Sequence, residues 1–221
     1  LIDHAVLHHT QTDDDLRAAC AMCVAVGAAS VCVKPAMVPL TAELLAGSRT
    51  VPSTVIGFPH GLAALGAKEV EAALVVADGA HEVDMIINVS ALRSGAELIV
   101  FEEIERVVAA SNLGGAIVKV IIECAYLTDA EKQRASKLAE EAGAAFVKTS
   151  TGFAPTGATA ADVALMRQSV SESVGIKAAG GIRSLAFAAE LVSAGASRLG
   201  TSGGIALLAE YGGAPVNTTN S

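Results

Sequence analysis

A short glycine motif that recurs four times constrains the fold of this chain more than any other feature. The pattern Gly-Ala-x-x-[Val/Leu] begins at Gly27, Gly79, Gly143 and Gly195, and each copy follows an alanine-rich stretch and precedes an apolar run. Glycine at the C-terminal end of a helix adopts the left-handed conformation without a steric clash, and the chain then enters a strand. The repeat therefore predicts helices that alternate with buried β-strands.

The apolar runs have the length of strands and the spacing of βα units. Seven of them lie at 30–33, 54–58, 82–88, 118–123, 146–150, 175–180 and 198–202, and a further run lies at 2–7. Strands that alternate with helices imply a parallel sheet. Because eight units fit within 221 residues, we expect an α/β fold with one domain, a (β/α)8 TIM barrel over residues 1–213, followed by a flexible tail at 214–221.

A doubly wound open sheet is the alternative that the alternation leaves open. It would place a glycine-rich fingerprint in the first βα turn, and this chain has none there. Helix starts are also visible. Thr128 and Glu131 form a capping box, and four further caps are predicted from hydroxyl residues that precede helical stretches. These are Thr12, Thr41, Thr159 and Ser184.

Composition and charge exclude several classes of protein. Apolar residues make up 52% and aromatic residues only 3%, which excludes a disordered chain and a base-stacking surface for nucleic acid. The net charge of −8 argues against nucleic acid and against an anionic membrane as partners. The longest uncharged stretch, 18–33, is too short to span a bilayer. Four cysteines do not form a disulfide framework, so we expect a cytoplasmic protein.

Charged residues interrupt the apolar runs. Asp84 and Lys177 each lie between apolar neighbours, and Lys148 lies between Val147 and Thr149. Lys119 and Glu123 lie four residues apart on one face of a predicted strand. A single charge in a strand usually marks the end of that strand. Several strands that each carry a charge are different, because an unpaired buried charge costs several kcal/mol. We expect these side chains to converge near the C-terminal mouth of the barrel, where active sites lie.

A carboxylate beside several lysines is suited to imine chemistry. A free lysine has a pKa near 10.4, so only about one in 2,500 is neutral at pH 7. A second ammonium group and partial desolvation lower that pKa, and the neutral amine then attacks carbonyl groups to form a Schiff base. Asp84 is the available carboxylate. The set predicts carbon–carbon lyase chemistry, although spacing alone does not select among Lys119, Lys148 and Lys177.

Three glycine-bearing segments follow the last three predicted strands, at 149–152, 180–183 and 200–204. Glycine in such a turn lets backbone N–H groups approach an anion, and Arg183 adds a positive charge. An ordinary tight turn also uses glycine, but three such turns at this end of a barrel favour a phosphate site.

Together these motifs resemble those of the deoxyribose-phosphate aldolases, a family of class I (Schiff-base) aldolases with a (β/α)8 fold. The matching segments run in family order from residue 2 to about residue 208. They are Val31-Cys-Val-Lys-Pro35, Ile56-Gly-Phe-Pro59, Glu82-Val-Asp-Met-Ile-Ile-Asn88, Lys119-Val-Ile-Ile-Glu123, Phe146-Val-Lys-Thr-Ser-Thr-Gly-Phe153, Lys177-Ala-Ala-Gly-Gly-Ile-Arg183 and Leu199-Gly-Thr-Ser202.

The resemblance implies reversible cleavage of 2-deoxy-D-ribose 5-phosphate to D-glyceraldehyde 3-phosphate and acetaldehyde, in deoxyribonucleotide catabolism. It makes Lys148 the imine-forming nucleophile, Lys177 the cation that lowers the pKa of Lys148, and Asp84 the proton relay. Substrate-binding roles are implied for Asp3, Cys32, Lys119 and Thr149. Phosphate-binding roles are implied for Gly152, Gly180, Gly181, Arg183, Gly200, Ser202 and Gly203. The chain departs from the family pattern at Ala5, Ala178 and Gly203.

The resemblance implies no cofactor and no metal. The expected partners are the sugar phosphate, acetaldehyde and further copies of the chain. His4, His8 and His9 lack a further ligand at zinc spacing, and the Cys20/Cys23 pair lies in a predicted helix that favours packing over redox chemistry. The alternatives are a phosphate-binding barrel isomerase, a Schiff-base aldolase for another sugar phosphate, and a sugar-phosphate-binding regulator without activity.

Overall fold

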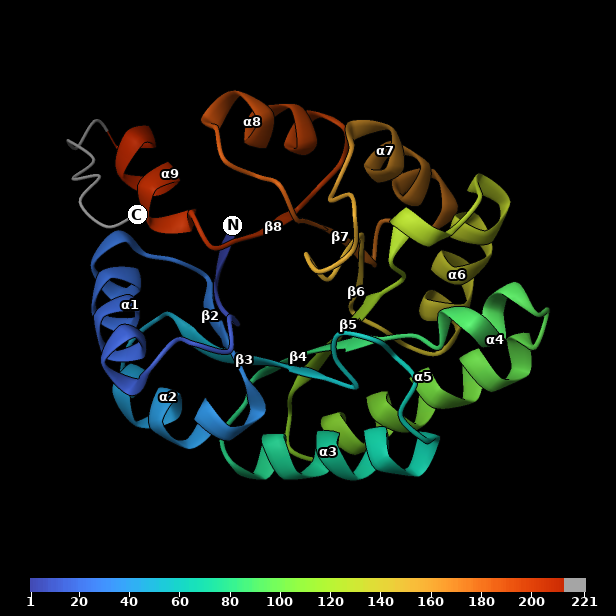
Figure 1. Ribbon diagram of the computed structural model, residues 1–221, viewed down its shortest axis with the longest axis horizontal. Helices are drawn as coiled ribbons and strands as arrows, with labels where there is room; N and C mark the ends of the chain where they lie inside the picture. Colours follow the sequence, from blue (N-terminus) through green and yellow to red (C-terminus); the bar gives the residue numbers. More distant parts are fainter. Residues whose placement is uncertain (213–221) are drawn as a thin grey trace.

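The computed structural model describes residues 1–212, which form a closed barrel of eight parallel strands surrounded by helices (Figure 1). The strands are β1 Ile2–Val6, β2 Ser30–Val33, β3 Val51–Ile56, β4 Glu82–Ile86, β5 Ile117–Ile121, β6 Phe146–Lys148, β7 Gly175–Ala179 and β8 Arg198–Thr201. Each strand pairs with the next, and β1 pairs with β8, with Asp3 opposite Gly200. The predicted TIM barrel is therefore confirmed, and the open sheet was the wrong alternative.

Helices follow the strands and form the outer layer of the barrel (Figure 1). They are α1 Asp13–Val26, α2 Val38–Leu45, α3 Leu65–Ala77, α4 Val89–Arg93, α5 Glu97–Asn112, α6 Asp129–Glu141, α7 Ala160–Ser169, α8 Leu185–Ser193 and α9 Gly204–Tyr211. Two short 3-10 helices, η1 Pro35–Met37 and η2 Cys124–Tyr126, lie in the loops after β2 and β5.

The glycine repeat marks the helix ends that lead into every second strand. Gly27, Gly79, Gly143 and Gly195 all have positive φ, between 70° and 114°. They precede β2, β4, β6 and β8, respectively. A residue with a Cβ is strained in this conformation, so the repeat has a direct structural cause.

Most of the predicted helix caps are confirmed. Thr12 and Thr128 form capping boxes, and the Thr159 and Ser184 side chains accept hydrogen bonds from backbone N–H groups in the first turns of α7 and α8. The predicted cap at Thr41 is wrong. Helix α2 begins at Val38, after Pro35 has already turned the chain, so Thr41 lies inside it and donates to the Met37 carbonyl.

Most predicted strands end one or two residues earlier in the structure, and the differences at β3 and β5 change the interpretation of nearby residues. Strand β3 begins at Val51, although Pro52 and Ser53 obscure its apolar pattern, and it ends before Gly57, whose φ is 60°. Strand β5 ends at Ile121. Glu123 therefore does not share a strand face with Lys119, and it adopts a left-handed φ of 54° in the loop that follows.

Alternation along the strands separates an apolar layer from a charged barrel interior. In β4, Val83 and Met85 belong to the apolar core beneath the helices, whereas Glu82 and Asp84 make ion pairs with side chains from other strands. Neighbouring residues of a strand face opposite sides, so the same strand serves both environments. The fold thus delivers charged groups from several strands to one central space.

We predict that Thr128→Ala lowers the free energy of unfolding by about 1 kcal/mol, because the N-terminal turn of α6 loses a hydroxyl that accepts from the Glu131 N–H. Thermal unfolding monitored by circular dichroism should show a melting temperature lower by roughly 2–4 °C. Thr128→Ser retains the hydroxyl and serves as the matched control. Equal melting temperatures for the two variants would contradict the capping role.

The predicted flexible tail at 214–221 lies outside the described residues. None of the helices within residues 1–212 is long and apolar enough to cross a bilayer.

Candidate active site

Asp84 lies at the centre of the charged interior. It is fully buried in β4, and its carboxylate accepts hydrogen bonds from three lysines on β5, β6 and β7. Lys119 Nζ lies 2.9 Å from Asp84 Oδ1, and Lys148 Nζ and Lys177 Nζ each lie 2.7 Å from Asp84 Oδ2. The Lys148 and Lys177 amines thus share one oxygen atom, which brings two positive groups close together.

A second layer of charge lies deeper in the barrel. Lys119 also pairs with Glu82 at 2.7 Å, and Arg198 of β8 bridges Asp3 at 2.6 Å and Glu82 at 3.2 Å. Asp3 in turn contacts Lys177 at 2.6 Å. The converging charges that the sequence predicted are therefore confirmed for Asp84 and the three lysines. Asp3, Glu82 and Arg198 complete the set, which forms one connected network.

The pKa of Lys148 shifts in the opposite direction to the pKa values of Lys119 and Lys177. Burial lowers the pKa of Lys148, Asp84 opposes this effect, and the nearby Lys177 lowers it further, so the net shift is downward. Burial also acts to lower the pKa of Lys177, but Asp3 and Asp84 outweigh it and the net shift is upward. For Asp84, burial acts to raise the pKa, but the lysines hold it well below its usual range. Lys148 is thus the lysine poised to supply a neutral amine.

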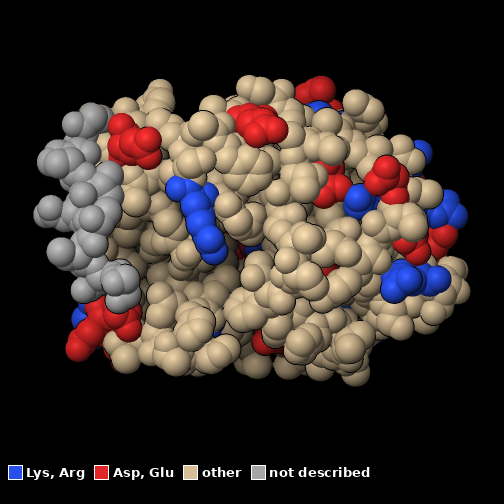
Figure 2. Space-filling model, turned by 45° about the horizontal axis from the view of Figure 1, so that its top comes forward, with Lys and Arg blue, Asp and Glu red and all other residues tan. Residues whose placement is uncertain are grey.

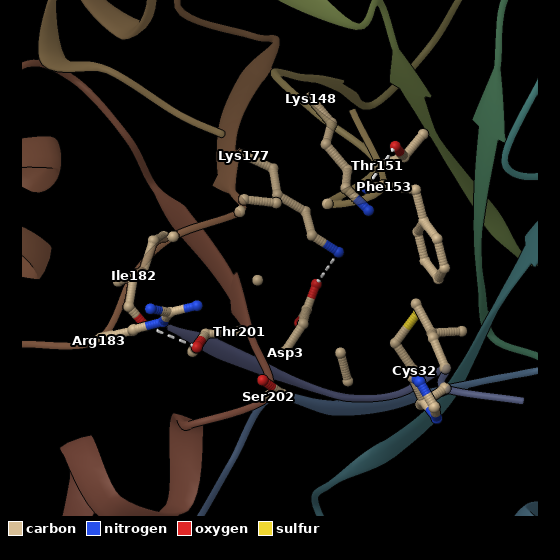
Figure 3. Close-up of a pocket in the computed structure, with 18 of the residues that line it drawn as sticks. Asp3, Cys32, Lys148, Thr151, Phe153, Lys177, Ile182, Arg183, Thr201 and Ser202 are labelled. Atoms are coloured by element: carbon tan, nitrogen blue, oxygen red, sulfur yellow. Dashed lines mark hydrogen bonds and ion pairs between the residues drawn. The ribbon is translucent and has the colours of Figure 1, made fainter. Parts of the chain in front are cut away.

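A cavity of about 300 Å³ opens above this network at the C-terminal end of the barrel. Figure 3 shows Lys148, Lys177 and Asp3 pointing toward one another at one end, while Arg183 and Ser202 lie at the other. The surface in Figure 2 is dominated by uncharged side chains, with a basic side chain beside a hollow. Basic groups thus lie at the cavity, where Lys148, Lys177 and Arg183 line it, despite the net charge of −8.

Most of the predicted site residues line this cavity. They are Asp3, Cys32, Lys148, Gly152, Lys177, Gly180, Gly181, Arg183, Gly200 and Ser202. Asp84 and Lys119 lie beneath it. Asp84 contacts Lys148 and Lys119 contacts Asp3, both of which line the cavity. Thr149 is buried outside it, and its hydroxyl accepts from the Ala179 N–H. Gly203 also lies outside, and its N–H donates to the Thr201 hydroxyl.

Close contacts with neighbouring atoms explain why glycine occupies two positions of the site. A Cβ on Gly200 would lie 3.0 Å from Lys177 Cε, so glycine lets the Lys177 side chain pass across β8. Gly180 has a φ of 87°, and a Cβ on it would lie 2.9 Å from the Gly157 Cα. Gly200 therefore leaves room for the Lys177 side chain, whereas Gly180 supports a tight loop at the rim of the cavity.

The loops after β6, β7 and β8 provide the groups suited to an anion. Gly152, Gly180 and Gly181 have φ between 78° and 88°, which turns the backbone over the cavity. Within the described residues, no hydrogen bond uses the backbone N–H of Gly152, Gly181 or Ser202. Backbone donors beside an exposed arginine can hold a phosphate group.

Glu123 has a different role from the one its spacing predicted. Its buried carboxylate accepts the N–H and the hydroxyl of Thr151, whose hydroxyl oxygen in turn accepts the Phe153 N–H. It thereby fastens the loop that follows Lys148. Glu123 and Phe153 also line a second cavity of about 520 Å³ over the other half of the barrel mouth. A turn residue after the strand cannot be recognised from period-two alternation alone.

Metal and redox alternatives find no support in the described part of the chain. No group of three or more histidine, cysteine, aspartate or glutamate side chains within residues 1–212 is arranged to hold a metal ion. His4 is buried, and burial lowers its pKa to about 4. Cys20, Cys23, Cys32 and Cys124 are all buried and unbonded.

The comparison with protein families agrees with this geometry. The model of the family described as DeoC/LacD family aldolase matches residues 1–213. The chain belongs to the DeoC/LacD aldolase family. The expectation of an aldolase, a carbon–carbon lyase, is therefore confirmed.

Curated family members resemble this chain over almost its whole length. A deoxyribose-phosphate aldolase of Carboxydothermus hydrogenoformans is 48% identical over 210 residues, which cover 94% of this chain and 92% of the relative. Another, of Lysinibacillus sphaericus, is 47% identical over 208 residues, 94% of this chain and 93% of the relative.

Solved structures of similar proteins share the barrel. The structure described as "QR15, an Aldolase" has 37% identity and a TM-score of 0.90, over 95% of this chain and 93% of that chain. The deoxyribose phosphate aldolase of Aeropyrum pernix, described as a unique tetrameric structure, has 31% identity and a TM-score of 0.88, over 96% of this chain and 89% of that chain.

The departures from the DeoC family pattern lie in different environments. Ala5 lines the cavity and has no hydroxyl to offer a substrate, whereas Ala178 belongs to the apolar core outside the barrel. Several cavity residues were not predicted from the sequence. They include His8, Gln11 and Phe153 in loops, for which no pattern in one sequence provides a signal. Glu82 and Arg198 did have a signal, because each is a charge at the start of a predicted strand.

Proposed function

We propose that this aldolase reversibly cleaves 2-deoxy-D-ribose 5-phosphate to D-glyceraldehyde 3-phosphate and acetaldehyde through a Schiff base on Lys148. The observation that carries the proposal is the Lys148 amine, which has a lowered pKa, shares Asp84 Oδ2 with Lys177 and lines the cavity. The names of the relatives support the choice of substrate. An anion-binding end of the cavity beside Arg183 supports a phosphorylated substrate.

The reaction begins with the open-chain aldehyde. The neutral Lys148 amine attacks C1 to form a carbinolamine, and protonation of its hydroxyl by the Lys177 ammonium lets water leave to give the protonated imine. Lys177, held as an ammonium by Asp3 and Asp84, donates a hydrogen bond to the departing oxygen and favours the neutral form of Lys148. Asp3 orients this ammonium, and the buried Cys32 shapes the wall of the cavity beside it.

Cleavage of the carbon chain follows. Loss of the C3 hydroxyl proton forms the C3 carbonyl, the C2–C3 bond breaks, and its electron pair moves into the imine to give an enamine. Glyceraldehyde 3-phosphate then departs. The proton passes through a water to the Asp84 and Lys177 pair and returns to C2, after which hydrolysis releases acetaldehyde and the Lys148 amine. The lysines hold the pKa of Asp84 well below its usual range, so its carboxylate orients the water that carries the proton and stays ionised itself.

The phosphate end fixes the substrate so that C1 reaches Lys148. Gly152, Gly180, Gly181 and Ser202 supply backbone donors, and Arg183 supplies charge. Gly200 and Thr149 act indirectly, through the packing of Lys177 and the hydrogen bonds to Ala179. Lys119 acts from below by sharing Asp84.

The decisive experiment is chemical trapping. Incubation with acetaldehyde and borohydride, followed by peptide mass spectrometry, should place a reduced adduct on Lys148. Turnover should be measured with 2-deoxyribose 5-phosphate and with other sugar phosphates. An adduct on another lysine, or a preference for another sugar phosphate, would reject the proposal.

We predict that Arg183→Gln raises KM for 2-deoxyribose 5-phosphate by about 10- to 100-fold, the effect of one lost hydrogen bond to a charged group. Its kcat should change much less, because Arg183 lies at the far end of the cavity from Lys148. Steady-state kinetics with unphosphorylated 2-deoxyribose provide the control, since that substrate should not distinguish the variant from the wild type. An equal loss with both substrates would show that Arg183 does not bind phosphate.

We further propose that the enzyme works in the cytoplasm, in the breakdown of deoxyribonucleotides, and that it assembles as a homo-oligomer. The four unbonded cysteines suit a reducing compartment. The tetrameric relative from Aeropyrum pernix supports an assembly of identical subunits. Analytical ultracentrifugation would determine the oligomeric state.

A further inference from the structure

The ion-pair network in the barrel contains more positive than negative groups. Its members are joined by contacts of 3.5 Å or less. The four basic groups are Lys119, Lys148, Lys177 and Arg198. The three carboxylates are Asp3, Glu82 and Asp84. With every member ionised, the network therefore carries one excess positive charge.

This excess cannot be dispersed into solvent. The side chains of the three lysines and of Asp3 and Asp84 are 4% exposed or less, Glu82 is 9% exposed, and Arg198 is 16% exposed. An uncompensated charge in such surroundings is costly, and the group that is held least firmly gives up its proton.

The contacts identify that group. Among the carboxylates of residues 1–212, Lys119 contacts Asp3, Glu82 and Asp84, and Lys177 contacts Asp3 and Asp84, whereas Lys148 contacts Asp84 alone. Arg198 stays charged because a guanidinium does not deprotonate in proteins. Loss of the proton from Lys148 leaves three basic groups opposite three carboxylates, and the network is then balanced.

We propose that Glu82 and Arg198 are positioning residues that hold this charge balance and thereby set the acidity at which Lys148 becomes a neutral, reactive amine. Neither residue lines the cavity. Both lie at the first position of a strand, below the lysines, and they act through Lys119 and Asp3. The inference rests on the proposed function, because it assumes that neutral Lys148 begins the reaction.

Other polar and titratable groups also face the network. Cys32 of β2 lies beside Asp84 and the lysines, and burial raises the pKa of its thiol, which keeps it neutral. Glu123 lies near Lys148 but is bound by Thr151. Ser53 of β3 accepts a hydrogen bond from Lys119. The backbone amine of Leu1 lies near Arg198, Asp3 and Glu82. The variants below leave all of these groups unchanged.

The proposal predicts opposite effects for two variants that each remove one charge. Glu82→Gln removes a negative charge, so Lys119 draws more strongly on Asp84 and Lys148 loses its proton at lower pH. Arg198→Met removes a positive charge but retains an apolar side chain over the Phe146 ring. Asp3 and Glu82 then have only lysines as basic partners in the network. The protonated lysines are stabilised as a result, and Lys148 keeps its proton to higher pH.

The experiment measures kcat/KM for 2-deoxyribose 5-phosphate from pH 5 to 9, because its acid limb reports the essential base of the free enzyme. Activity should fall in acid as Lys148 is protonated. We expect the acid limb to move by about half a pH unit, to lower pH in Glu82→Gln and to higher pH in Arg198→Met. At a fixed pH on this limb, the fraction of maximal activity should then be about threefold higher than wild type in Glu82→Gln and about threefold lower in Arg198→Met. The substrate phosphate titrates identically in all assays, so it does not contribute to a difference between variants.

The double variant Glu82→Gln/Arg198→Met is the sharpest test. It removes one charge of each sign, so its acid limb should return to that of the wild type, whereas purely structural damage would accumulate. Arg198→Lys keeps the charge and should leave the limb in place. Glu97→Gln and Arg134→Gln, which change an exposed ion pair between α5 and α6, are matched controls and should not move it.

Shifts in the same direction, or a double variant displaced further than either single variant, would overturn the inference. Borohydride trapping with acetaldehyde separates this outcome from failure of the proposed function. An adduct on Lys148 in every variant without opposite shifts rejects only the charge balance. No adduct on Lys148 in the wild type rejects the Schiff-base mechanism itself.

Discussion

Lys148→Met is expected to abolish aldol cleavage, with kcat lower by about four orders of magnitude or more, since the nucleophile that forms the covalent intermediate is lost. The variant should nevertheless fold. Methionine fills a similar volume, and removal of the ammonium group leaves Asp84 paired with Lys119 and Lys177. Steady-state kinetics should show the loss of activity, while circular dichroism and thermal unfolding should show a native barrel.

Lys177→Met is the matched control for this experiment. It removes an equivalent buried lysine from the next strand but keeps the Lys148 amine. We expect borohydride to trap an adduct on Lys148 in this variant, with activity recovered in part at higher pH, because Lys148 has lost the neighbouring cation that lowers its pKa. Substantial activity in Lys148→Met would contradict the imine mechanism.

Asp84→Asn is expected to cause the largest loss of stability of any single change in the network. The side chain is completely buried and accepts hydrogen bonds from three lysines, which would lose their shared anion. Breaking a buried ion pair by removing one partner costs about 3–5 kcal/mol. For a domain of this size, the melting temperature should fall by about 10 °C, as measured by thermal unfolding.

A compensating variant tests whether charge is the cause. Asp84→Asn combined with Lys148→Met removes one positive group along with the anion, so part of the lost stability should return, although activity should not. If the double variant were less stable than Asp84→Asn, unbalanced charge would not explain the loss. Glu97→Gln, at the surface, should change the melting temperature very little, because exposed ion pairs contribute little.

Much of the fold was predictable because its signals are local. The Gly27 repeat reports a backbone conformation that a residue with a Cβ resists, and the Thr128 and Glu131 pair reports a cap that forms within one turn. The errors at Thr41, at the start of β3 and at Glu123 have a common cause. In each case, the true boundary of the element carries no local signal: α2 begins before Thr41, β3 begins before its apolar run, and β5 ends before Glu123.

The candidate site was predictable in part. Charges inside apolar strands pointed to Asp84 and the three lysines, because a buried charge requires a partner. The partners themselves could not be assigned, since they come from strands that are far apart in the sequence. Arg198 and Asp3 lie 195 residues apart and yet are 2.6 Å apart in the barrel.

By itself, the sequence determined the alternation of helix and strand and the residue types needed for imine chemistry, and it favoured a barrel of eight units over an open sheet. Short segments of sequence carry this information, because glycine positions report backbone conformation and apolar runs can be counted along the chain. The structure established the closure of that barrel. Only the tertiary structure decided which lysine is left with a single carboxylate contact. Within residues 1–212, the barrel places Asp3 against Lys177 and leaves Lys148 with Asp84 as its one carboxylate partner, which is why we propose Lys148 as the nucleophile.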